Sequence, residues 1–166
     1  MNESVGNAFL FNLVISIIII LLTFFIGSMS YSKASKVKNK IIEEIEKQGE
    51  YENANFRYQG ADIYNNAEDE ITNWLGTSGI GYKKNNRAGQ SSPCREDDGD
   101  GGILINQRTE YEYCIYLHST CTSDSNKKCG EYFTVVAYMY FDIPVIQDFI
   151  KIPVKGETMT FSQITS

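Results

Sequence analysis

The sequence predicts an α+β protein in which one long N-terminal helix leads into a second helix and a small antiparallel sheet. Three observations predict this class: an uncharged apolar stretch at residues 5–32, a helical repeat that continues beyond it, and alternating β-branched and aromatic residues in the last third. We divide the chain into four parts by residue number: a short tail or leader at 1–7, a transmembrane helix at 8–30, a helical stem at 31–48, and an extracytoplasmic α+β domain at 49–166. The last part, at roughly 120 residues, has the size of one ordinary domain.

The apolar stretch at residues 5–32 contains no Asp, Glu, Lys or Arg. A bilayer core is crossed by about 20 apolar residues, so the stretch is long enough to span a membrane. A buried core helix rarely stays apolar on every face over so many turns. A cleaved signal peptide normally has a basic start and an apolar core of about 7 to 15 residues, whereas Glu3 is the only charged side chain here before a longer core. The pattern favours a transmembrane helix over both alternatives.

The helical repeat continues after the span into the stem, where Val37, Ile41 and Ile45 recur at steps of four among lysines and glutamates. We expect one helix from about residue 8 to residue 48, with Gly49 ending it. The apolar face of this stem would be exposed in water unless it meets either the distal domain or another subunit.

Polar side chains interrupt the span and the stem in different ways. Asn12, Ser16 and Thr23 lie within the apolar stretch, where they could form hydrogen bonds with neighbouring helices. In the stem, Lys40 is spaced to pair with Glu43 and Glu44 by one helical turn.

Four cysteines, all in the distal domain, indicate its compartment. They are Cys94, Cys114, Cys121 and Cys129. An even number beyond a membrane anchor predicts two disulfides in an oxidising space. The spacing contains no C-x2-C pair and the chain has a single histidine, so a zinc site is the weaker interpretation. A bond between residues 121 and 129 would staple a loop, leaving 94 to bond 114, although four cysteines allow three connectivities.

The charge distribution gives two further indications. The net charge of −6 argues against a nucleic-acid partner. Four lysines, at positions 33, 36, 38 and 40, directly follow the span and none precedes it. The positive-inside rule alone would therefore place the distal domain in the cytoplasm. The cysteines indicate the opposite, and we favour the outside orientation that they require.

The remaining elements follow from periodicity and turn residues. Residues 61–75 have helical spacing, and residues 109–118 and 132–141 are predicted to be antiparallel neighbouring strands. Residues 151–154 and 158–164 are expected to form a closing hairpin.

The connection at residues 76–102 is long and rich in Gly, Ser and Asn. Within it, Glu96, Asp98 and Asp100 have the spacing of the first ligands of a calcium-binding EF-hand loop. The twelfth position is Gln107, which lacks the carboxylate that such a loop needs. A solvated acidic turn is the favoured interpretation, and calcium the weaker one.

No catalytic set is recognisable in the sequence. It contains no nucleophile elbow, glycine-rich phosphate loop or H-E-x-x-H motif, and His118 has no evident nucleophile or orienting carboxylate. We therefore expect a protein that is not an enzyme and that uses no cofactor.

The order of elements resembles the type IV pilin-like proteins, and most closely the TadE-like minor pseudopilins. The ending carries the more specific likeness: Phe-Asp-Ile-Pro-Val-Ile at residues 141–146, a short turn, then Ile-Pro-Val-Lys-Gly-Glu-Thr at residues 152–158. The family usually has a glutamate five residues into the processed segment, and Phe11 would stand there if cleavage followed Gly6.

The resemblance implies a membrane-anchored subunit of a type IV or Tad-type pilus, or of a secretion or DNA-uptake apparatus, that acts by assembly with other pilin-like subunits. In that case Val37, Ile41 and Ile45 would continue the helix packing outside the lipid. One alternative is a solitary anchored surface domain that binds a ligand or a cell-wall component through an aromatic face. The tyrosines of that face would be Tyr111, Tyr113, Tyr116, Tyr132, Tyr138 and Tyr140. A cytoplasm-facing anchored regulator is a third hypothesis, if the lysines decide the orientation.

Overall fold

The computed structural model describes residues 2–54, 60–84, 94–106, 110–120, 130–140 and 151–162. Helix α1 spans Asn2–Ala54 and helix α2 spans Gly60–Thr77. The strands are β1 (Ile103–Leu104), β2 (Tyr113–Ser119), β3 (Gly130–Tyr140), β4 (Lys151–Glu157) and β5 (Phe161–Ser162). The predicted α+β class is confirmed.

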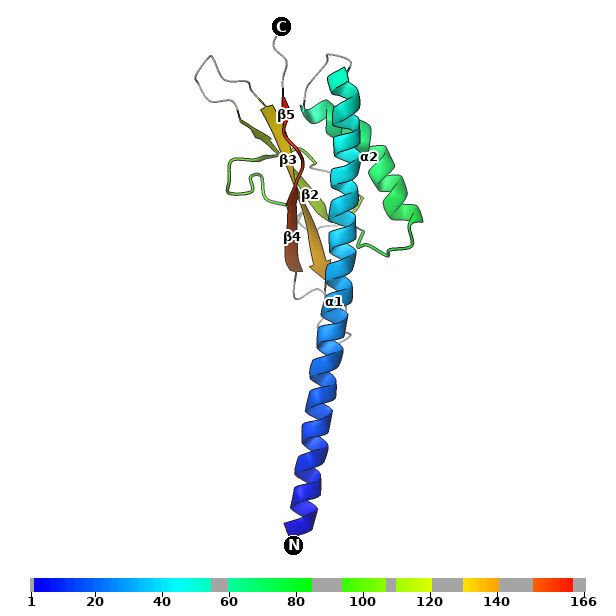
Figure 1. Cartoon of the computed structure of the whole chain (residues 1–166), viewed down its shortest axis with the longest axis vertical. Coiled ribbons are helices and arrows are strands. Elements are labelled where there is room, and N and C mark those ends of the chain that lie inside the picture. Colours follow the sequence, from blue (N-terminus) through cyan, green and yellow to red (C-terminus); the bar gives the residue numbers. More distant parts are fainter. Residues whose placement is uncertain are drawn as a thin grey trace.

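Helix α1 sets the outline of the molecule. Its N-terminal half projects bare from the rest of the chain, whereas its C-terminal half packs against the sheet and α2 (Figure 1). The first large side chains of the bare half are open to solvent, with Phe9 67% and Phe24 76% exposed. In the other half, Val37, Ile41 and Ile45 are all 0% exposed. The same helix is therefore both a projection and part of the domain core.

The end of α1 differs from the prediction, because the helix passes through Gly49 and continues to Ala54. The aromatic ring of Phe161 packs directly on Gly49, and a Cβ atom added there would overlap that ring. The glycine therefore permits a close contact within the helix and does not end it. The second helix agrees with the prediction to within two residues at each end.

The sheet has the order β1-β2-β3-β4, and every neighbouring pair is antiparallel. The predicted pairing of the two central strands is confirmed, with Tyr113 opposite Ala137 and Ser119 opposite Glu131. Because side chains alternate across a strand, β2 sends Tyr113 and Ile115 towards the helices and Cys114 and Tyr116 towards the other face.

The predicted closing hairpin is wrong. Strands β4 and β5 both pair with β3, and the expected turn residues are themselves part of that ladder, with Gly156 opposite Val135. Between the two strands, the Thr158 N–H donates to the Phe133 carbonyl oxygen at 3.0 Å. The two strands are therefore successive segments of one edge. That edge lies against α1, since a Cβ atom added at Gly156 would meet the Lys38 and Ile42 side chains.

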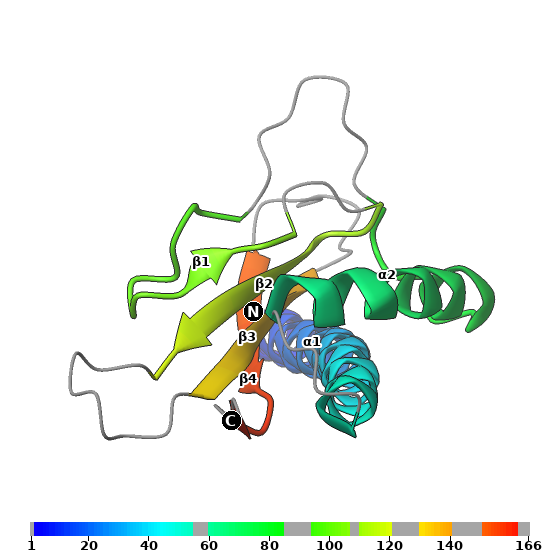
Figure 2. The same cartoon turned by 90° about the horizontal axis from the view of Figure 1, so that it is seen from above.

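The core lies between the sheet and the two helices. Seen along α1, the sheet lies on one side of the helix and α2 crosses beside it, leaving a further side of α1 uncovered (Figure 2). Fully buried members of the core come from all four main elements; they include Ile41, Ile45, Ile63, Ile71, Tyr113, Ile115, Phe133 and Val135. The hydroxyls of Tyr64 and Tyr113 lie 3.3 Å apart across the contact between α2 and the sheet.

Candidate functional site

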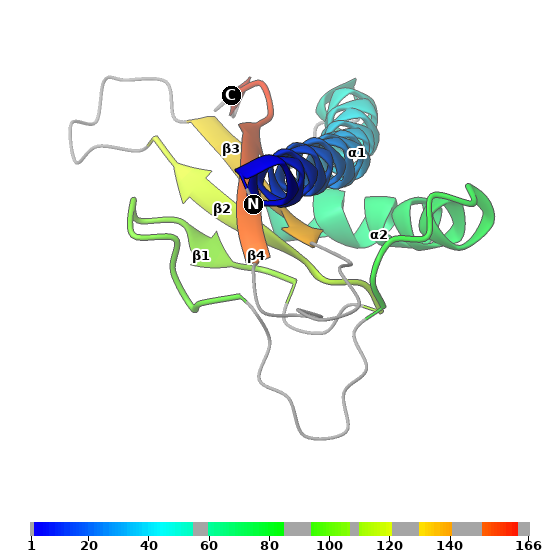
Figure 3. The ribbon, with the colours of Figure 1, turned by 90° about the horizontal axis from the view of Figure 1, so that it is seen from below.

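The exposed half of α1 is the largest apolar surface of the described chain. Within α1, and in no other described helix, lies an 18-residue window that is long and apolar enough to cross a membrane; none of it is buried. This half of the helix stands clear of the other elements when the molecule is seen from below (Figure 3). Its exposed large side chains include Phe9, Leu10, Phe11, Ile19, Ile20, Leu21, Leu22, Phe24, Phe25 and Met29. A helix of this kind serves as a membrane anchor or as a signal.

Two of the three polar side chains expected to bond neighbouring helices, Asn12, Ser16 and Thr23, are satisfied within the helix itself. The Ser16 hydroxyl donates to the Asn12 carbonyl oxygen at 2.8 Å, and the Thr23 hydroxyl donates to the Ile19 carbonyl oxygen at 2.8 Å. Such bonds to the preceding turn remove the need for an outside partner. The Asn12 side chain makes no hydrogen bond within the described part of the chain, so it is the one of these three that a neighbouring helix would satisfy.

The stem residues occupy a different place from the one that the resemblance implied. Val37, Ile41 and Ile45 pack in the domain's own core and are 0% exposed, so they offer no surface to another subunit. Their role as assembly residues is therefore corrected to that of core residues. The helical repeat could not distinguish the two roles, because a face packed on its own sheet and a face packed on a neighbour have the same spacing.

Charged side chains of α1 pair with one another at the border of the domain core, where Glu44 is buried. Lys40 pairs with Glu43 at 3.0 Å and with Glu44 at 2.8 Å, as the spacing predicted. The hydrogen bond from Lys40 lowers the pKa of Glu44, against the effect of burial. Beside these pairs lies an open groove of about 380 Å³. It is lined by Asn39, Ile42, Glu43, Glu46, Lys47 and Glu50.

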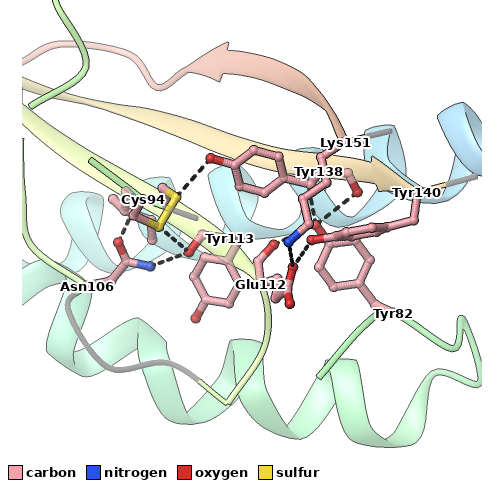
Figure 4. The surroundings of a disulfide bond; sticks show 10 residues. Tyr82, Cys94, Asn106, Glu112, Tyr113, Tyr138, Tyr140 and Lys151 are labelled. Carbon is pink, nitrogen blue, oxygen red and sulfur yellow. Dashed lines mark hydrogen bonds and ion pairs between the residues drawn. A yellow bond between two sulfur atoms is a disulfide. The ribbon is translucent and has the colours of Figure 1, made fainter. Parts of the chain in front are cut away.

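The disulfide lies on the sheet face that points away from the helices. Cys94 is bonded to Cys114, with their Cα atoms 5.6 Å apart, as one of the predicted connectivities has it (Figure 4). Asn106 supports the same strand, donating to the Tyr113 carbonyl oxygen at 2.8 Å and accepting from the Ile115 N–H at 2.6 Å. Cys121 and Cys129 lie outside the described residues.

A polar cluster closes the end of the sheet where β3 finishes and β4 begins (Figure 4). The Glu112 side chain is buried, accepts a hydrogen bond from the Tyr140 hydroxyl, and pairs with Lys151 at 3.2 Å. Burial raises the pKa of Tyr140, and the bond to Glu112 raises it further. The Tyr82 hydroxyl accepts from the Tyr138 N–H at 2.8 Å and donates to the Glu112 carbonyl oxygen at 2.9 Å. These contacts fasten the segment after α2 to the sheet.

The acidic turn of the long connection is more ordered than expected. The Asp98 side chain is 3% exposed and lies 2.8 Å from His118 Nε2, and it accepts the N–H groups of Asp100 and Gly102, each at 3.0 Å. Burial on its own would raise the pKa of Asp98, but these donors and the imidazole together hold it below its usual range. The Thr134 hydroxyl lies 3.0 Å from the same nitrogen. Through Asp98 and His118 the turn is therefore fastened to the sheet and is not a merely solvated loop. We call this contact between Asp98 and His118 the latch.

The calcium candidate finds no support in this geometry. Among the described residues, which include Glu96, Asp98 and Asp100, no group of three or more His, Cys, Asp or Glu side chains is placed to hold a metal ion. Both Asp98 oxygens already serve donors of the chain itself. No local pattern signals the Asp98–His118 pair, because the two residues stand twenty positions apart in the chain.

The tyrosine set proposed as a binding face does not form one. Tyr111, Tyr113 and Tyr116 are buried, at 3%, 1% and 4% exposed. They also lie on both faces of the sheet, since Tyr113 belongs to the core beside the helices and Tyr116 to the cluster beside the disulfide.

Comparison with protein-family models, with curated proteins and with solved structures found no match. The long apolar N-terminal helix packed on an antiparallel sheet is a pilin-like shape. The membership of the TadE-like family that the ending suggested has no support from these comparisons.

Proposed function

We propose that the chain is a membrane-anchored, pilin-like subunit that acts by assembly, with its domain outside the cytoplasm and without catalytic activity. The observation that carries the proposal is the continuity of α1, which runs unbroken from an exposed apolar half into the core of the domain. Its partners would be further pilin-like subunits and the machinery that assembles them.

A simple tether does not need this continuity. An anchor needs about 20 apolar residues, and a flexible linker then lets the domain move freely. Here Tyr31 is 56% exposed while Ala34, one turn further on, is 1% exposed and already part of the core. A movement of the apolar half is therefore transmitted directly to the domain, as a subunit that is pushed or packed through its helix requires.

The exposed apolar side chains also need a cover. Each large one contributes roughly 1.5 to 3 kcal/mol when it leaves water, whether the cover is lipid or the same helix of a neighbour. The helix can leave lipid for contact with neighbouring helices, so one surface serves both as an anchor and as an assembly surface. The Asn12 amide, which has no hydrogen-bond partner among the described residues, favours helix neighbours over lipid at that level of the span.

The solitary surface domain remains a hypothesis of another class. Its proposed aromatic face is largely buried, and we therefore favour assembly.

Photo-crosslinking of the full chain in its membrane tests the proposal. A photoreactive phenylalanine analogue at Phe24, which is 76% exposed, should yield a ladder of covalent multimers. The same analogue at the exposed Lys155 of β4 is the matched control for random collision. Adducts at Phe24 with lipid alone, and no ladder, would contradict the proposal.

A further inference from the structure

Two bands of opposite charge lie on the outer surface of α1. The band nearer the apolar half holds Lys33, Lys36 and Lys40, and the band nearer the C-terminal end of the helix holds Glu43, Glu46 and Glu50. Both sets have the same internal spacing of three and then four residues, and the second repeats the first ten residues further along.

This offset has a fixed geometry on a helix. Ten residues correspond to a rise of about 15 Å and to about 80° less than three full turns, so the two bands lie on adjacent faces. The acidic band lines the open groove on α1, which borders the β4 edge of the sheet because Ile42 of its lining lies against Gly156. Ile42 gives the groove an apolar side chain beside the carboxylates.

The charges differ in how far the chain itself already satisfies them. Lys40 is held by Glu43 and Glu44, and the Glu46 side chain accepts the Met159 N–H at 2.8 Å. Lys33 and Lys36 are exposed and form no ion pair within the described part of the chain. Two lysines at one level thus lack a counter-charge, while the lining of the groove ten residues higher holds Glu43, Glu46 and Glu50 against the single ammonium of Lys47.

We propose that the groove on α1 receives α1 of a second copy of this chain, parallel to the first and displaced by about 15 Å along the helix axis. In this arrangement Lys33 of the displaced copy faces Glu43 of the first, and Lys36 faces Glu46. Because the two faces in contact are different, the contact is heterologous and can be repeated from copy to copy without closing on itself. The inference rests on the proposed function and specifies how copies pack in it.

The displacement separates two modes of association. Copies anchored side by side in a bilayer have their apolar stretches at one depth, so lysine faces lysine and glutamate faces glutamate. A shift of ten residues exchanges these repulsions for attractions, but it draws part of the apolar half out of the lipid. The charge bands therefore favour an assembly in which neighbouring helices have replaced the membrane as the cover of the apolar half.

Charge reversal in the full chain tests this geometry, with the photo-crosslinked ladder from the Phe24 position as the readout. One variant carries Lys33→Glu and Lys36→Glu, a second carries Glu43→Lys and Glu46→Lys, and a third carries all four changes. Ion pairs at the surface are individually weak, but each of the first two variants reverses two charges, so we expect these variants to lose roughly five-fold in ladder yield or more. The third variant should recover the wild-type yield, because it restores opposite charges at the displaced contact. In the side-by-side arrangement the four changes would only exchange one repulsion for another.

The possible results discriminate clearly. Loss in both partial variants with recovery in the third supports the displaced contact, provided that the thermal midpoint shows each domain to be folded at the temperature of the crosslinking. An unaltered ladder in all three variants overturns the displaced contact and leaves the proposed function standing. A loss that the third variant fails to recover overturns it as well. If the unmodified chain gives no ladder at all, the proposed function itself fails.

Discussion

The two halves of α1 are both rich in apolar residues, yet the structure uses them in opposite ways. In the N-terminal half the apolar side chains point in all directions and stay exposed, such as Ile20 at 66%. In the C-terminal half they occupy one face only, and Ile41 is 0% exposed. The distribution of apolar residues round a helix, and not their number, therefore decides whether the helix enters lipid or packs on its own domain.

Two matched substitutions, one in each half of α1, test this difference, and the one in the core half should have the largest effect on stability. Ile41→Ala should lower the free energy of unfolding of the domain by about 2 to 5 kcal/mol, because it opens a cavity in the core. Ile20→Ala, the matched control in the exposed half, should change it by less than about 0.5 kcal/mol. Urea unfolding in detergent, followed by the fluorescence of the single Trp74, measures both. Equal losses of stability at the two sites would contradict the different roles of the two halves of α1.

The second prediction concerns the sheet face that α1 does not cover. Replacing Cys94 and Cys114 together by alanine should cost about 3 kcal/mol, the size expected for a loop of this length. The same unfolding experiment measures the loss. Treating the folded, unreduced wild-type chain with a thiol reagent provides the control, since both cysteines should resist it. Rapid labelling at either position would contradict the bond and remove the main support for an extracytoplasmic domain.

The third prediction concerns the latch that ties the long connection to the same face. Because the pKa of Asp98 is lower in the folded chain than in the unfolded one, its contribution is fully present above the ordinary range of an aspartate. That contribution is lost as the pH falls through the lowered value. Asp98→Asn should therefore destabilise the domain by about 1 to 3 kcal/mol at neutral pH. The difference from wild type should shrink towards strongly acidic pH.

A pH series of urea midpoints for the two proteins measures this effect. The exposed Asp100, replaced in the same way, is the matched control, since it contributes its backbone N–H to the Asp98 side chain and the substitution keeps that N–H. A difference that stayed constant from neutral to strongly acidic pH would show that the Asp98 charge does not act through the latch.

The elements with a clear period were predictable from the sequence, and those that depend on a distant partner were not. Residues 132–141 have the β-branched and aromatic content of a central strand, and β3 is found there. The last segment has similar content, but its pairing with β3 depends on which neighbour is free, and the local turn residues at 155–157 suggested a hairpin instead. Short-range turn chemistry was outweighed by an available edge next to α1.

The candidate site shows the same limit. The apolar stretch was recognisable because a span needs only its own residues. The role of Val37 was not, since it depends on what packs against it, and the buried pair of Asp98 and His118 joins two segments that have no local signal for each other. The groove on α1 also required the structure, because only the fold shows which side of the helix stays open.

The smallest expected change in stability concerns Gly49, which lies in the half of α1 that belongs to the domain. Glycine within a helix usually costs about 0.5 to 1 kcal/mol relative to alanine, so on helix propensity alone Gly49→Ala should stabilise the domain. Packing predicts the opposite, because the new methyl group would overlap the buried ring of Phe161. Overpacking of this kind costs about 1 to 3 kcal/mol, and after the gain in propensity we expect a net loss of about 1 kcal/mol.

Gly76→Ala in α2 is the matched control, because a Cβ atom there meets only the Tyr111 hydroxyl at an ordinary 3.5 Å. That change should be neutral or slightly stabilising. Phe161→Leu should cost less in the Gly49→Ala background than in wild type, since a smaller side chain leaves room for the methyl group, and a double-mutant cycle measures that coupling. Additive effects in the cycle would mean that Phe161 does not press on the helix. Close packing distinguishes the C-terminal half of α1 from its exposed half. In that case this packing would not explain why the helix continues through Gly49.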